Sequence, residues 1–239
     1  MRLFAVIVAG GSGVRFGGPV RKQYLELGGR PILLRSIGRI RESVHPVNTV
    51  VVAPAADLEL VSALIPAQWR GNTKVVPGGT ERQHSVYKGI QALPEAEDSD
   101  LILVHDAVRP LVSPAAVQAA VKSAGESGAS TVGIKMRETV KKVGPASPDI
   151  IMETVDRAPL WTVQTPQVFR AEWIKKAHER AATRETPGTD DCQLLEWMGR
   201  TVKLVAGNVE NIKITTPEDL AVAEALVRGD LVKLAEVPA

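Results

Sequence analysis

Residues 3–15 of the chain read LFAVIVAGGSGVR, a short apolar run that ends in a glycine-rich loop. A run of valine and isoleucine bounded by glycine is typical of a buried strand in a parallel sheet. In open α/β sheets, ligands bind at the loops that follow such strands. Gly10, Gly11 and Gly13 have no Cβ atom, so the backbone can take a positive φ and its N–H groups can close on an anion. The stretch therefore predicts a parallel α/β sheet with a phosphate-binding loop, and a triphosphate is the expected anion.

Two common phosphate motifs do not fit this loop. The P-loop requires a lysine and then serine or threonine after its last glycine, whereas Gly13 is followed by Val14 and Arg15. The dinucleotide fingerprint fails as well, because Phe16 stands where its last glycine would be. The loop is instead followed by two cations, Arg15 and Lys22, which can neutralise phosphate charge. Together with residues 211–215 (NIKIT), the loop is interpreted as a nucleotide-phosphate site.

Strand-like and helix-like patterns alternate along the rest of the chain. This alternation predicts a three-layer α/β/α sandwich with a mostly parallel sheet. The expected strands are 3–8, 49–53, 74–76, 101–104, 130–134 and 202–205, and the expected helices are 32–43, 114–124, 173–182 and 217–227. Ser113 and Thr216 are expected to cap the two helices that begin with proline.

Residues 136–160 break this alternation. They contain several cations and prolines but little apolar periodicity. Long stretches of this kind are uncommon in compact domains and are often functional. We therefore expect an arm that leaves the core, either as a loop or as a segment that packs on something else. Residues 1–239 are expected to form a single domain, with 136–160 as a protruding arm within it.

Composition limits the class of protein. The chain has 239 residues, 44% of them hydrophobic, with a formal net charge of +2, so it can bury a full core and lacks the strong basic bias of nucleic-acid-binding proteins. No apolar run approaches the roughly 20 residues that a bilayer span needs. Residues after Arg2 have no signal-peptide layout, so a cytoplasmic location without a membrane partner is expected. The single cysteine, Cys192, excludes an internal disulfide and a CxxC metal site.

Asp106 and Arg109 lie just beyond the carboxyl end of the strand expected at 101–104. In α/β sheets this position favours a ligand contact. The alternative is a local ion pair between the two side chains that only closes the loop. His105, beside them, is interpreted as a structural histidine rather than an acid or base.

Seven blocks of the sequence resemble one enzyme family, the 2-C-methyl-D-erythritol 4-phosphate cytidylyltransferases. The blocks stand in the family's order and span nearly the whole chain: AGGSGVR (9–15), KQYL (22–25), GGTER (78–82), VHDAVRP (104–110), TVDR (154–157), QTPQ (164–167) and NIK (211–213). The resemblance implies a Rossmann-like nucleotidyltransferase sheet and transfer of a cytidylyl group from CTP in isoprenoid precursor biosynthesis. It also implies Mg²⁺ carried mainly by the CTP phosphates, and a homodimer in which the arm of one subunit completes the substrate site of the other.

The resemblance assigns roles to particular residues. Catalysis is expected from Arg15, Lys22, Arg157 and Lys213; nucleotide binding from Ala9, Gly10, Gly11, Gly13, Gly78, Gly79 and Ser85; and substrate binding from Asp106, Arg109, Thr139, Arg157, Thr165 and Thr189. Asp106 is also the expected protein contact of the metal. Thr189 has a second interpretation, as the N-cap of a helix that contains residues 192–197.

The chemistry implied needs no general base. A phosphate monoester has a second pKa near 6, so the attacking group is already an anion at neutral pH. Bringing two anions together depends on positioning and on cations. The sequence departs from the family at position 80, where threonine stands in place of an expected aspartate.

Three other functions stay open. A D-ribitol 5-phosphate cytidylyltransferase shares several blocks, but the segment 154–161 (TVDRAPLW) favours methylerythritol phosphate. A glycosyltransferase would need an Asp-x-Asp motif at a strand end, which neither residues 99–100 nor residues 105–106 provide. A CTP-binding regulatory protein would keep the glycine loop without needing Asp106, Arg157 or Lys213.

Overall fold

A seven-stranded, mostly parallel sheet forms the centre of the protein. The computed structural model describes residues 1–10, 16, 20–145, 147–184 and 186–238. The strand order is β11-β7-β10-β6-β1-β4-β5, and β10 alone runs antiparallel to its neighbours in this sheet. The strands are β1 (Leu3–Val8), β4 (Asn48–Ala53), β5 (Thr73–Pro77), β6 (Leu101–Asp106), β7 (Ala129–Lys135), β10 (Trp161–Arg170) and β11 (Lys203–Ala206). The predicted α/β fold is confirmed.

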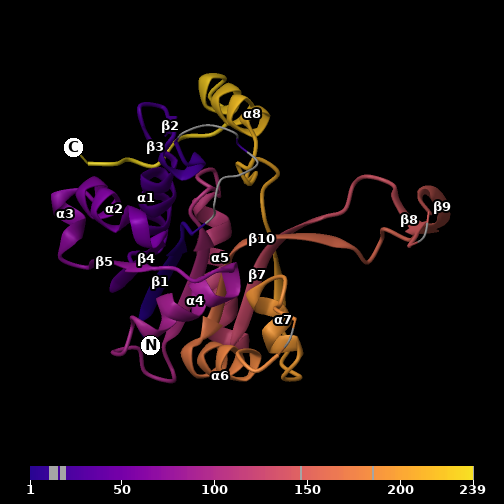
Figure 1. The fold of residues 1–239 in the computed structure, drawn as a ribbon, viewed down its shortest axis with the longest axis horizontal. Coiled ribbons are helices and arrows are strands. Elements are labelled where there is room, and N and C mark those ends of the chain that lie inside the picture. Colours follow the sequence, from indigo (N-terminus) through magenta and orange to yellow (C-terminus); the bar gives the residue numbers. More distant parts are fainter. Residues whose placement is uncertain (11–15, 17–19, 146, 185, 239) are drawn as a thin grey trace.

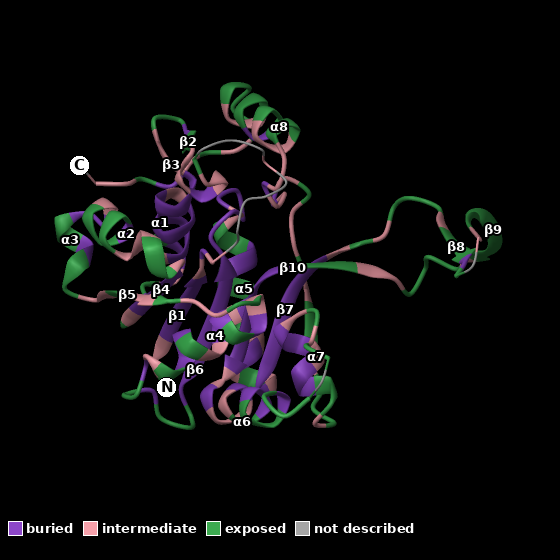
Figure 2. Ribbon diagram, viewed as in Figure 1, coloured by how far each residue is buried: buried purple, intermediate pink, exposed green. Residues whose placement is uncertain are grey.

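Helices cover both faces of this sheet (Figure 1). They are α1 (Ile32–Val44), α2 (Leu58–Leu64), α3 (Ala67–Arg70), α4 (Arg82–Gln91), α5 (Pro114–Ser127), α6 (Ala171–Ala181), α7 (Asp191–Glu196) and α8 (Pro217–Arg228). Residues of α1 and α5 share one apolar core with alternate residues of β1, and residues of α4, α6 and α7 share the other. Most residues of the sheet are buried between these layers (Figure 2). Within the described ranges, no helix is long and apolar enough to cross a membrane.

Several elements were not expected from the sequence, and in two of them, β10 and α4, a residue in the element explains why. β10 contains Pro166 and an irregular register between Val163 and Gln167, and a proline inside a run argues against a strand. α4 contains Gly89, which weakens the helical pattern. Packing explains this glycine, since a Cβ atom there would come within 2.5 Å of Val6 Cγ1.

The segment 136–160 leaves the sheet as an arm (Figure 1). It is not a plain loop, because β8 (Val140–Gly144) and β9 (Ser147–Val155) pair antiparallel near its far end. Most of β9 is exposed (Figure 2), and Met152 at 69% is among its most exposed apolar side chains. A second short hairpin, β2 (Glu26–Leu27) and β3 (Arg30–Pro31), lies before α1. The single-domain organisation stays a prediction.

An ion pair at the amino end of β6 makes the stability of the fold depend on pH in the acid range. Arg2 contacts the buried Asp100 at 2.7 Å, directly before Leu101. Burial alone would raise the pKa of Asp100, but hydrogen bonds from Arg2 and from backbone N–H groups lower the pKa to about 2. A carboxyl whose folded pKa lies below its unfolded value of about 3.9 stabilises the fold above that value. This contribution is lost as the pH falls toward 2.

We therefore expect Asp100→Asn to be less stable than the native protein at pH 7. Its free energy of unfolding should also fall less steeply between pH 4 and pH 2, because the titrating group is gone. Urea unfolding of both proteins at several pH values measures this difference. Parallel curves would show that Asp100 does not contribute to the acid dependence.

Candidate active site

A cavity opens at the carboxyl ends of β1, β5 and β6. Its volume is about 320 Å³. Its described lining comprises Val8, Ala9, Gly10, Lys22, Gln23, Thr80, Glu81, Arg82, Ser85, Asp106, Val108 and Lys213. The position agrees with the rule that open α/β sheets bind ligands beyond the carboxyl ends of their strands. Segments from both ends of the chain thus meet at one site.

Asp106, the last residue of β6, is the centre of a charge cluster at this cavity. Arg82 Nε lies 3.2 Å from its Oδ1, Lys213 Nζ lies 2.8 Å from its Oδ2, and Arg109 Nε lies 3.7 Å from the same Oδ2. Burial alone would raise the pKa of Asp106, but the positive charges of Arg82, Lys213 and Arg109 hold it well below its usual range. Asp106 is therefore ionised in a site where cations outnumber it. The local Asp106–Arg109 pair considered from the sequence exists as part of this larger cluster.

Lys213 reaches the cluster because buried Asn211 fixes the segment before α8. The side-chain amide of Asn211 donates to Gln164 Oε1 and to the carbonyl of Thr165, both at 3.0 Å. Arg109 Nη1 donates to the carbonyl of Asn211 at 2.7 Å. The neighbouring Ile214 belongs to a small apolar cluster with Val108, which packs residues of α8 over the loop after β6. The segment from the far end of the chain is thus held beside Asp106.

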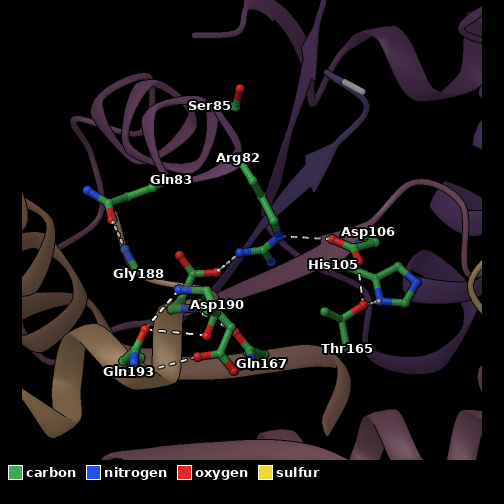
Figure 3. A network of polar contacts seen from close by, with 12 residues as sticks. Arg82, Gln83, Ser85, His105, Asp106, Thr165, Gln167, Gly188, Asp190 and Gln193 are labelled. Carbon is green, nitrogen blue, oxygen red and sulfur yellow. Dashed lines mark hydrogen bonds and ion pairs between the residues drawn. The ribbon is translucent and has the colours of Figure 1, made fainter. Parts of the chain in front are cut away.

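His105 has a structural role, as expected. The side chain is fully buried, its Nε2 is bonded to the carbonyl of Arg109, and its Nδ1 is bonded to the Thr165 hydroxyl (Figure 3). Burial lowers its pKa to about 4, so the ring is neutral at pH 7. The Thr165 hydroxyl also accepts the Asp106 N–H at 3.1 Å. The Thr165 hydroxyl is therefore bonded to His105 and to the backbone of Asp106, and its expected substrate contact stays a prediction.

Gly10, Gly78 and Gly79 gather around Ser85 of α4. The Ser85 hydroxyl accepts the Gly79 N–H at 3.1 Å and donates to the Glu81 carbonyl at 3.0 Å. A Cβ atom at Gly78 would lie 2.9 Å from Ser85 Oγ, so the close approach requires glycine. Gln23 fixes the first loop by donating to the Ala9 carbonyl at 2.8 Å. Arg15, Gly11 and Gly13, also expected in this site, lie outside the described residues.

Three of the expected residues lie elsewhere in this chain. Thr139 and Arg157 are on the arm, where they line a separate hollow beside Thr154. Thr189 is exposed and bonds to Gln193, and the cap interpretation for it is wrong, because the side chain of Asp190 accepts the Gln193 N–H and caps α7. Within the part of the chain that the structure describes, the site brings together Lys22, Asp106, Arg109 and Lys213 with the nucleotide residues Ala9, Gly10, Gly78, Gly79 and Ser85, but not with the arm residues.

Arg82 is the residue that sequence reasoning missed. It begins α4, lines the cavity and contacts Asp106 (Figure 3). Its Nη1 also donates to Asp191 Oδ2 at 2.7 Å. Burial alone would lower the pKa of Arg82, but Asp191 and Asp106 raise it, so the charge is permanent. The sequence did contain a signal for Arg82, because this arginine is the last residue of the block GGTER, which begins directly after β5.

Comparison with known proteins identifies similar chains over nearly the full length. A family model described as 2-C-methyl-D-erythritol 4-phosphate cytidylyltransferase matches residues 3–229. Curated proteins with that name from Pelotomaculum thermopropionicum and Syntrophotalea carbinolica are 44% and 41% identical. The matches cover 98% of both chains in the first case, and 95% of this chain and 97% of the relative in the second.

Solved structures give the same result. The crystal structure of 4-diphosphocytidyl-2C-methyl-D-erythritol synthase from Anaerococcus prevotii has a TM-score of 0.83 at 30% identity, covering 95% of this chain and 96% of that one. The crystal structure of 2-C-methyl-D-erythritol 4-phosphate cytidylyltransferase from Thermus thermophilus has a TM-score of 0.77 at 30% identity. It covers 95% of this chain and 100% of that one.

Proposed function

The chain belongs to the 2-C-methyl-D-erythritol 4-phosphate cytidylyltransferase (IspD) family, and we propose that it transfers the cytidylyl group of CTP to 2-C-methyl-D-erythritol 4-phosphate. The products are 4-diphosphocytidyl-2-C-methyl-D-erythritol and pyrophosphate, on the route to isoprenoid precursors. The observation that carries this proposal is the cluster of Arg82, Arg109 and Lys213 around Asp106, at a cavity beside Gly10, in a chain that the family model matches over residues 3–229.

The reaction is a displacement at the α-phosphorus of CTP. A phosphate oxygen of the acceptor forms the new P–O bond, and the bond to the β-phosphate oxygen breaks with its electron pair leaving on pyrophosphate. The acceptor is already ionised at pH 7, so no proton has to be removed from the attacking group. Neutral, fully bonded His105 agrees with a site that needs no general base.

Cations supply most of the stabilisation in this mechanism. Lys22 lines the cavity beside the glycine loop, and Lys213 lines it from the opposite end of the chain. Both are proposed to neutralise charge on the transferring phosphate and on the leaving pyrophosphate, together with Arg15. The Arg109 side chain is less exposed than that of Lys213, and it donates to the Asn211 carbonyl. Arg109 is therefore proposed to stabilise the charge cluster and to offer a polar contact at the edge of that cluster.

Magnesium is proposed to enter with CTP. Among the residues that the structure describes, no group of three or more His, Cys, Asp or Glu side chains could hold a metal ion. Asp106 is the acidic contact expected for the metal, but cations already lie at both of its oxygens. Mg²⁺ prefers oxygen ligands such as those of triphosphate and water, so we propose that the ion is bound mainly by the CTP phosphates. Excess chelator should abolish pyrophosphate release, and full activity in chelator would contradict this role.

The nucleotide assignment is tested by comparing the four ribonucleoside triphosphates. Purified protein with Mg²⁺ and 2-C-methyl-D-erythritol 4-phosphate should release pyrophosphate with CTP far faster than with UTP, ATP or GTP. A site that pairs the edge atoms of one base leaves polar groups unsatisfied when another base enters. The backbone groups of Gly78 and Gly79 and the Ser85 hydroxyl are the proposed base contacts. Equal rates with UTP would contradict cytosine selection.

The arm is proposed to reach a second copy of the chain. Ile150, Ile151 and Met152 on β9 are exposed apolar residues, as expected for a surface covered in a homodimer. Thr139 and Arg157 lie on the same arm, away from the described wall of the cavity in their own chain. A partner's arm would bring these two residues to the acceptor phosphate. The cytoplasmic location stays a prediction.

Mixing two inactive variants tests whether the site is shared. We expect Arg157→Ala and Lys213→Ala chains, each nearly inactive alone, to recover activity when mixed in equal amounts and allowed to exchange subunits. About a quarter of the native activity is expected, since about half of the dimers would be mixed and each would contain one intact site. A mixture no more active than its components would contradict a site built from two subunits.

A further inference from the structure

Arg82 lies between two carboxylates, one at the cavity and one in the interior. Its Nε is 3.2 Å from Asp106 Oδ1 (Figure 3), and its Nη1 is 2.7 Å from Asp191 Oδ2. We propose that Arg82 is a positioning residue, which holds Asp106 so that Lys213 can leave that carboxylate and bind substrate phosphate. The proposal rests on the proposed function, because the phosphate role of Lys213 belongs to it.

The interior carboxylate is a fixed anchor. The Asp191 side chain is 1% exposed, and its Oδ1 lies 3.0 Å from His178 Nε2. Its backbone N–H donates to Gln167 Oε1 at 3.2 Å. Because Asp191 is held from two sides at the start of α7, the guanidinium that it binds has a fixed position. A lysine has no planar fork to span both carboxylates in this way.

The two oxygens of Asp106 have different partners. Oδ1 faces Arg82, whereas Oδ2 faces Lys213 at 2.8 Å and Arg109 at 3.7 Å. The Lys213 side chain is 39% exposed, compared with 26% for Arg82 and less for Arg109. Lys213 is thus the cluster cation with most access to an incoming phosphate.

Exchange of Lys213 between Asp106 and phosphate requires that Asp106 keep a strong partner. A buried carboxylate left without its cation is costly. With Arg82 in place, Asp106 stays paired through Oδ1 when Lys213 turns away. Without Arg82, we expect Lys213 to stay on Asp106, which weakens its contact with substrate.

A double-mutant cycle tests this coupling. Arg82→Gln should lower kcat/KM about thirtyfold in the native background and about threefold or less when Asp106→Asn is already present, as for residues that act through each other. Asp191 contacts neither the cavity nor Asp106, but Asp191→Asn should also lower kcat/KM. This loss should disappear when Asp106→Asn is already present. Arg82→Lys, which keeps the charge but not the fork, should recover only part of the activity.

Arg2→Gln is the matched control, since it also removes an arginine from a buried aspartate at 2.7 Å, at the other end of the sheet. It should lower thermal stability and leave kcat/KM unchanged. Equal losses for Arg82→Gln in both backgrounds would mean that Arg82 acts on substrate directly, and would overturn the positioning role. A loss with Arg2→Gln as large as with Arg82→Gln would also overturn it. If the native protein releases no pyrophosphate, both the proposed function and the positioning role are overturned. If the native protein is active but the effects of Arg82→Gln and Asp106→Asn simply add, only the positioning role is overturned.

Discussion

Replacing Lys213 with alanine is expected to lower kcat/KM for pyrophosphate release by about a hundredfold or more, the usual loss for one charged contact in a transition state. Lys213 Nζ lies 2.8 Å from Asp106 Oδ2 at the cavity, and the side chain is partly open to an incoming phosphate. Its loss removes a positive charge where two anions must meet. Steady-state rates with CTP and the acceptor varied in turn measure the effect.

The fold should survive this change, because Asp106 keeps Arg82 and Arg109 as partners. Lys176→Ala is a suitable control: Lys176 forms an ion pair of 2.7 Å with Glu172, on α6 and away from the cavity. The control should keep the native kcat/KM and a similar melting temperature. A Lys213→Ala protein that retained most of its native turnover would contradict the phosphate role of this lysine.

Asp106→Asn is expected to impair both stability and activity. The substitution preserves the shape of the side chain but removes the negative charge at the centre of Arg82, Arg109 and Lys213. Breaking a buried ion pair usually costs about 3 to 5 kcal/mol, and we expect about 3 kcal/mol, because Arg82 keeps Asp191 and Lys213 can turn to water. Urea unfolding measures the loss of stability, and pyrophosphate release measures the loss of turnover.

Asp100→Asn separates these two effects. Asp100 stands directly before β6 and Asp106 is the last residue of β6, so the two buried carboxylates mark opposite ends of one strand. Asp100 pairs with Arg2, away from the cavity. The Asp100 variant should lose stability and keep its kcat/KM, whereas the Asp106 variant should lose both. Similar kcat/KM losses in the two variants would mean that Asp106 acts only through stability.

Local patterns were enough to predict most of the fold. The apolar run of β1 and the alternation that follows it gave the predicted α/β sheet, and the six expected strands and four expected helices are present. The predicted caps are confirmed, since Ser113 accepts from Ala116 N–H and Thr216 forms a capping box with Asp219. Each of these features depends on residues close together in the chain.

Long-range contacts were harder to predict. Arg82 binds Asp191, 109 positions along the chain, and no local spacing indicates that contact. The seven blocks contain Arg82 but not Asp191 or His178, so the anchor behind the cluster appears only in the folded protein. The cap of α7 was misassigned by one residue because Thr189 and Asp190 are both good capping residues, and the fold decides between them.

The identity of the acceptor can be measured in one assay. Purified protein with CTP and Mg²⁺ is given 2-C-methyl-D-erythritol 4-phosphate or D-ribitol 5-phosphate in parallel, and pyrophosphate release is followed. We expect rapid release with the methylerythritol phosphate and little with ribitol phosphate. Release with ribitol phosphate alone would assign the protein to a different cytidylyltransferase reaction. Binding of CTP without release in either case would contradict catalysis and favour a regulatory role.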